Sequence, residues 1–133
     1  MNDGFTEEKR LSKRYLCDEF FELIGLEVNQ HSFSMTAIDF NKDGIGLFSN
    51  DAIPECGNVT LTLRYHSPAF NYIFKDLSCS IVHCNLTEVG SHCGLHFNQS
   101  KLSSNDKKAL ETIEEQLIKS DDPDDRYHLF REH

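Results

Sequence analysis

The sequence lacks the features that would place the protein in a membrane or mark it for export. No stretch approaches the roughly 20 apolar residues that a membrane-spanning helix needs. The first eight residues are polar and acidic, without an apolar signal core or a cleavage-site pattern. We therefore expect a cytoplasmic protein with no membrane span.

Basic residues are also few. Thirteen Lys and Arg against 22 Asp and Glu give a net charge of −9, which argues against nucleic-acid binding because that needs a broadly basic surface. Four of the thirteen cations are nevertheless clustered within six residues, at Lys9, Arg10, Lys13 and Arg14, whereas the acidic surplus lies mainly within 111–125. Such a cluster suits a small dianionic ligand, while the rest of the surface repels polyanions.

The number and spacing of the cysteines give no sign of a disulfide framework. The chain has five cysteines and no C-x-x-C. With an odd number and no export signal, we expect free, reduced and mostly buried thiols. They are Cys17, Cys56, Cys79, Cys84 and Cys93.

The length of 133 residues suits one domain, and a hydrophobic share of 38 % supports a modest core. Residues 1–14 are polar without periodicity, and we interpret them as a flexible arm. Residues 15–120 are expected to form the domain, and 121–133 an acidic tail.

Alternating polar and apolar residues predict six strands, followed by one helix that begins near Ser103 and ends near Ser120. The helix carries an apolar stripe of Ala109, Leu110, Ile113, Leu117 and Ile118. Strands at hairpin distances before a single helix favour a small mainly-β antiparallel barrel with a C-terminal α-helix. The predicted strands are 19–28, 32–38, 44–49, 59–65, 72–84 and 92–97.

Two short motifs occur in a fixed order. The first is Arg10-Leu11-Ser12-Lys13-Arg14, and the second is Asp39-Phe40-Asn41-Lys42-Asp43-Gly44. Together they resemble the signature of the PilZ family of cyclic di-GMP receptors, R-x-x-x-R followed by [D/N]-x-S-x-x-G. Every signature position fits except one, where Asn41 stands in place of serine.

The resemblance to the PilZ family covers roughly residues 9–119. Gly44-Ile45-Gly46-Leu47, Pro54-x-x-Gly57 and Gly94-Leu95-His96-Phe97 also look like PilZ sequence. The resemblance implies a six-stranded antiparallel PilZ-type barrel with a C-terminal helix, and cyclic di-GMP as the ligand. The site residues that it implies are Arg10, Arg14, Asp39, Asn41 and Gly44, with Lys9 and Lys13 beside the arginines.

The chemistry of these residues suits such a ligand. The planar fork of arginine pairs with phosphate oxygens or with guanine O6 and N7, and its face stacks on a purine. The Asp39 carboxylate can accept hydrogen bonds from a guanine edge. Asn41 can meet the ligand or brace the turn, and Gly44 lets the backbone come close.

The implied function is that of a bacterial single-domain receptor rather than an enzyme. It would order its arm over cyclic di-GMP and relay this state to a protein partner, in control of motility, adhesion or surface polymers. An alternative is a PilZ-like adaptor that contacts protein partners without binding nucleotide. The tail from Arg126 to His133 is a candidate partner contact.

Two metal-binding interpretations compete with this one. Residues 39–44 match the opening of a calcium-binding EF-hand loop, but Asn50 stands where that loop needs Glu, and the flanks alternate as strands. A Cys and His cluster suggests zinc, but alternation puts Cys93 on the core face, and a turn near Glu88 would place Cys84 opposite His92, leaving two ligands only. The cluster is Cys79, His83, Cys84, His92, Cys93 and His96.

Overall fold

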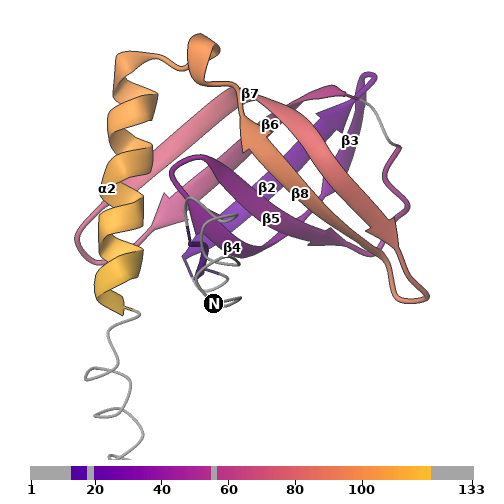
Figure 1. Cartoon of the computed structure of the whole chain (residues 1–133), viewed down its shortest axis with the longest axis horizontal. Coiled ribbons are helices and arrows are strands. Elements are labelled where there is room, and N and C mark those ends of the chain that lie inside the picture. The colour runs from indigo at the N-terminus through magenta and orange to yellow at the C-terminus, as the bar shows by residue number, and fades with distance from the viewer. Residues whose placement is uncertain (1–12, 18–19, 55–56, 121–133) are drawn as a thin grey trace, which may run out of the picture.

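The computed structural model describes residues 13–17, 20–54 and 57–120. Within them, eight strands form one antiparallel sheet that curls around a core, and helix α2 packs at one end of it (Figure 1). The strands are β1 (Tyr15–Leu16), β2 (Phe21–Val28), β3 (His31–Ser34), β4 (Thr36–Asn41), β5 (Gly44–Ser49), β6 (Asn58–His66), β7 (Asn71–Leu86) and β8 (Ser91–Phe97). A short 3-10 helix, η1 (Gln99–Lys101), leads to α2 (Ser104–Ser120).

The strand order is β1-β4-β5-β8-β7-β6-β2-β3. The sheet bends back on itself because Met35, between β3 and β4, donates its backbone N–H to the Ile24 carbonyl of β2 over 3.1 Å. The chain thus leaves its partner β2 at Met35 and pairs with β5 beyond it. The result is a curled half-barrel.

The predicted mainly-β antiparallel fold with a C-terminal helix is confirmed, and the strand number is eight rather than six. The predicted strand 32–38 is divided between β3 and β4, because the backbone changes partner at the buried Met35. The two-residue β1, which pairs with Phe40 and Asp39, is too short to give an alternation signal.

The core lies on the concave side of the sheet and beneath α2. On β6, buried Val59, Leu61, Leu63 and Tyr65 alternate with more exposed neighbours, as a half-buried strand requires. Each large apolar side chain removed from water contributes about 1.5–3 kcal/mol. The helix buries Ala109, Leu110, Ile113 and Leu117 of its predicted stripe, whereas Ile118 is 45 % exposed.

Polar contacts fix the position of α2 on the sheet. Ser103 Oγ accepts a hydrogen bond from the Asp106 N–H over 3.0 Å, which caps the N-terminus of the helix. Tyr72 donates to Asp106 over 2.6 Å, and burial together with this bond raises the pKa of Tyr72 to about 12. In the described part of the chain, no helix has the length and apolar character to cross a membrane.

The expectation of free cysteines is wrong for two of them, since Cys84 and Cys93 form a disulfide. An irregularity between Ile81 and His83 shifts the register of β7 on β8, so that Cys84 lies opposite Cys93, and Asn85 opposite His92, with Cα atoms of the two cysteines 4.2 Å apart. Sequence alternation contains no sign of such a shift. Cys17 and Cys79 are free and buried as predicted, and burial raises the pKa of Cys79 to about 12. Cys56 lies outside the described residues.

Candidate functional site

The candidate site lies on the outer face of the sheet, over a floor of three glycines. Gly44 and Gly46 lie on β5, and Gly94 lies opposite Gly46 on β8. The neighbouring residues Ile45, Leu47 and Leu95 point into the core and are fully buried. The outer face of these strands therefore lacks side chains of its own at the three glycines, and long side chains from adjacent strands lie across the glycine backbone and bury it.

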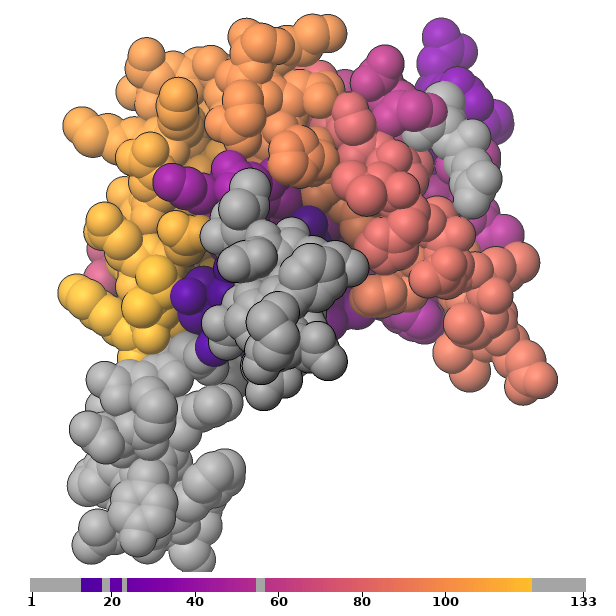
Figure 2. Space-filling view, viewed as in Figure 1, coloured from indigo at the N-terminus to yellow at the C-terminus, as the bar shows by residue number. Residues whose placement is uncertain are grey.

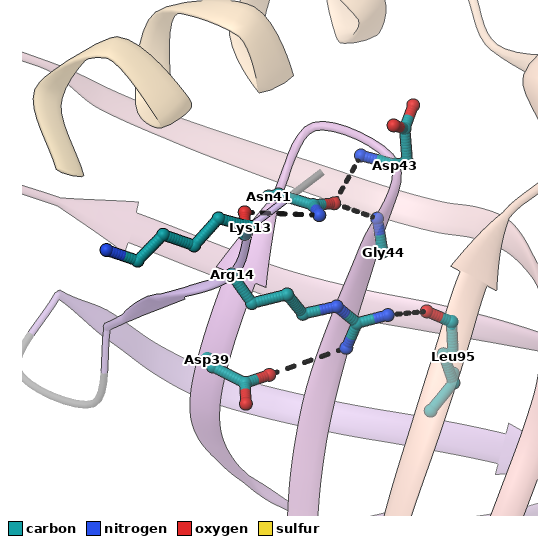
Figure 3. Close-up of polar contacts among 7 residues, drawn as sticks. All are labelled: Lys13, Arg14, Asp39, Asn41, Asp43, Gly44 and Leu95. Atoms are coloured by element: carbon teal, nitrogen blue, oxygen red, sulfur yellow. Dashed lines mark hydrogen bonds and ion pairs between the residues drawn. The ribbon is translucent and has the colours of Figure 1, made fainter. Parts of the chain in front are cut away.

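Arg14 crosses this floor from the segment before β1 (Figure 3). Its Nη1 lies 3.4 Å from Asp39 Oδ1 on β4, and its Nη2 lies 3.5 Å from the Leu95 carbonyl oxygen on β8. A Cβ atom on Gly44 would stand 2.5 Å from Arg14 Nη2 and 2.5 Å from the Leu95 oxygen. Only glycine at position 44 lets the guanidinium pass this close to the backbone.

Asp39 covers the second glycine in the same manner. It is the register partner of Gly46, and its carboxylate occupies the space that a Cβ on Gly46 would need. The side chains of Arg14 and Asp39 are 29 % and 33 % exposed. Both charged groups therefore face solvent and remain accessible to a ligand.

The turn between β4 and β5 is held by Asn41. Its Oδ1 accepts hydrogen bonds from the backbone N–H groups of Asp43 over 2.8 Å and Gly44 over 2.9 Å. Its Nδ2 donates to the Lys13 carbonyl oxygen over 3.4 Å. Asn41 is only 4 % exposed, so in this structure it braces the turn and ties the segment that carries Arg14 to it.

Helix α2 also contacts this turn. The backbone N–H of Lys42 donates to Glu114 Oε2 over 3.1 Å. In Figure 2 the turn, in purple, lies between helix α2 and the orange surface of the segment that precedes α2 in the chain. A displacement of the turn would thus alter the hydrogen bond to Glu114 on the face of α2 that carries this residue.

Four of the predicted site residues, Arg14, Asp39, Asn41 and Gly44, come together in space. Lys13 is exposed beside them, with its ammonium 5.3 Å from the centre of the Tyr15 ring. Lys9 and Arg10 lie outside the described residues. The sequence motif did not assign Gly46 and Gly94 to the site. Both alternate with apolar residues of the core, and this alternation was the signal that could have placed them on the outer face, where the site lies.

Neither metal-binding interpretation finds a site in the part of the chain that the structure describes. Residues 39–44 join two strands rather than two helices, and the Asn41 oxygen is taken by backbone N–H groups. The described residues contain no group of three or more His, Cys, Asp or Glu side chains placed to hold a metal ion. Cys84 and Cys93, two members of the proposed cluster, are bonded to each other.

A curled antiparallel sheet followed by one C-terminal helix is consistent with the fold of the PilZ domain. The chain is similar to the PilZ domain with c-di-GMP of YcgR from Escherichia coli, with a TM-score of 0.58 and 10 % identity over 81 % of this chain and 90 % of that one. It is also similar to the Bacillus subtilis inhibitor of motility MotI/DgrA, with a TM-score of 0.60 and 10 % identity, covering 84 % of this chain and 53 % of that one. No protein-family model matches the sequence, and no curated protein matches it either.

Proposed function

We propose that this protein is a receptor for cyclic di-GMP that binds the ligand over the glycine floor and relays its presence to a protein partner. The observation that carries the proposal is the Arg14–Asp39 pair, held above Gly44 and Gly46 on the outer face of the sheet. The c-di-GMP-bound PilZ domain of similar fold supports the choice of ligand.

The pair suits exchange with a ligand. Both of its hydrogen bonds are long, at 3.4 and 3.5 Å, and both partners are partly exposed. Such a pair is worth about 0–1 kcal/mol. In DNA readout a bidentate arginine–guanine contact contributes about 1–3 kcal/mol of discrimination against the wrong base, and charge-assisted contacts of this kind are stronger than neutral ones, so we expect the guanidinium to turn from Asp39 to the ligand.

The glycine floor and the Asp39 carboxylate would make the site specific for guanine over adenine. Because neither Gly44 nor Gly46 has a Cβ, a planar base can come close to their backbone once the Arg14 and Asp39 side chains that now cover them turn aside. Once Arg14 turns to the ligand, the Asp39 carboxylate is free to accept hydrogen bonds from N1–H and N2–H of guanine. Adenine offers no such pair of donors, and we therefore expect discrimination against cyclic di-AMP.

The second arginine of the motif, Arg10, and the neighbouring Lys9 would close over the ligand from the arm, with Lys13 adding positive charge at its base. These roles follow from the sequence motif. The proposed output is a change in the turn 41–44 that reaches α2 through the bond between the Lys42 N–H and Glu114.

Isothermal titration calorimetry tests the proposal. We expect saturable binding of cyclic di-GMP to the wild type, weaker binding of cyclic di-AMP, and a loss of affinity of about tenfold or more in Arg14→Ala and Asp39→Asn. Arg64→Ala, which removes the same charge from β6, is the matched control and should bind as the wild type does. A flat trace for folded wild-type protein at high micromolar ligand would favour the adaptor that does not bind nucleotide.

A further inference from the structure

The glycine floor continues beyond the Arg14–Asp39 pair. On the outer face, a row of register partners runs Asp39–Gly46–Gly94–His83, across β4, β5, β8 and β7. Three spacings between neighbouring strands amount to about 14 Å. The row is therefore longer than one purine, and it suits a ligand with two bases.

His83 covers Gly94 as Arg14 covers Gly44. A Cβ on Gly94 would come within 2.8 Å of His83 Nδ1 and closer still to Cε1, so the imidazole ring lies against the Gly94 backbone. The irregularity between Ile81 and His83 creates this arrangement, because it moves His83 onto the outer face while Cys84 turns to the core side and bonds Cys93. The disulfide lies directly behind the row and fixes β7 on β8 at this point.

The His83 ring is available to a ligand. The residue is exposed, and its ring contact within the described residues is with His92, at 6.0 Å between centroids and an angle of 51°. No hydrogen bond to another described residue occupies its nitrogens. Imidazole offers a flat face for stacking on a base and an N–H for a guanine acceptor.

We propose that His83 forms the second wall of the nucleotide site and stacks on the base that lies farther from Asp39. This inference rests on the proposed function and extends the site by two strands, from β5 to β7. It makes the site selective for a ligand with two bases, since a single base held against Asp39 would not span the about 14 Å of three strand spacings to His83.

The test is a calorimetric titration of cyclic di-GMP into three variants of the full chain. His83→Ala should weaken binding by roughly tenfold or more, because stacking of a base on an aromatic side chain is lost. His83→Phe keeps a flat ring and should retain most of the affinity. His31→Ala, which removes an exposed histidine from β3, is the matched control and should leave binding unchanged.

A spectroscopic measurement separates stacking from an indirect effect. The imidazole C–H resonances of His83, assigned by their absence from the His83→Phe spectrum, should shift upfield when cyclic di-GMP is added, because they enter the ring current of the base. Unchanged affinity in His83→Ala, while Arg14→Ala still weakens binding, overturns the second wall and leaves the proposed function standing. No binding by the wild type overturns both.

Discussion

The hairpins β4–β5 and β7–β8 are neighbours in the sheet, and their turns, which lie at opposite ends of the strands, are held by different means (Figure 1). The β4–β5 turn is fixed by polar side chains, since Asn41 bonds its backbone and Glu114 reaches it from α2. The β7–β8 turn is fixed by backbone shape and a covalent bond, through Gly90 at φ 148° and the Cys84–Cys93 disulfide.

From this difference we expect one part of the candidate site to respond to a ligand more readily than the other. The contacts of the β4–β5 turn use the same amide and carboxylate chemistry that a nucleotide would compete for, so a ligand can alter them. A nucleotide offers no group that could replace the disulfide behind His83 or the packing around Gly90. We therefore expect ligand binding to act on the β4–β5 turn and on α2, with the β7–β8 hairpin as a fixed wall.

The largest effect on stability is expected from Gly90→Ala. Its φ lies in the region that side chains rarely adopt, and the new Cβ would collide with the Ser49 backbone oxygen and crowd the Phe48 ring. Strain and overpacking together should lower the free energy of unfolding by about 3 kcal/mol or more. Urea denaturation followed by circular dichroism measures this change.

Gly57→Ala is the matched control for that substitution. Apart from its chain neighbours, no atom of the described residues lies within 4 Å of the position that its Cβ would take. The loss of backbone freedom in the unfolded chain should leave stability equal or raise it by up to about 1 kcal/mol. Equal destabilisation by the two substitutions would show that the positive φ and close packing of Gly90 are not needed by the β7–β8 hairpin.

Reduction of the disulfide should produce the next largest effect. The two cysteines are nine residues apart, and closing a loop of this size stabilises a fold by roughly 2.5 kcal/mol in the chain-entropy treatment. Urea denaturation with and without dithiothreitol, with the reduced state verified by mass, measures the difference. The double variant Cys84→Ala/Cys93→Ala should not respond to reductant, and an equal response in the wild type and this variant would contradict the assignment.

The outer and inner faces of β8 show what the sequence could predict. Alternation placed Cys93 on the core face of β8, and the structure confirms it, since Cys93, Leu95 and Phe97 are buried whereas His92 is half-buried and His96 is exposed. Helix α2 was predicted close to its observed bounds. These features depend on residues close in sequence, which is why their periodicity is informative.

The features that the sequence did not predict depend on contacts between distant segments. The register shift in β7, which pairs Cys84 with Cys93 and turns His83 outward, has no signal in the alternation of either strand. The path of Arg14 over Gly44 joins residues 30 positions apart, and the motif named both residues without indicating that one lies on the other. Sequence could thus name candidate site residues, whereas only the fold shows that the floor extends to Gly94.

Asn41→Ala, which disturbs the β4–β5 hairpin, should have a smaller effect on stability than the Gly90 substitution or reduction of the disulfide. The substitution removes the acceptor for two backbone N–H groups and the donor to Lys13, and the Gly44 N–H is buried. Leaving these groups without partners should lower the free energy of unfolding by about 2 kcal/mol. The same urea denaturation series measures it.

Asn41→Asp separates the two functions of this side chain. The carboxylate still accepts from the Asp43 and Gly44 N–H groups, but it cannot donate to the Lys13 carbonyl oxygen, so the loss should be about half as large. If Asn41→Asp destabilises the protein as much as Asn41→Ala does, the tie to Lys13 dominates and the turn does not depend on its acceptor. In that case Asn41 acts mainly by holding the segment that carries Arg14, and its substitution should weaken cyclic di-GMP binding more than it weakens the fold.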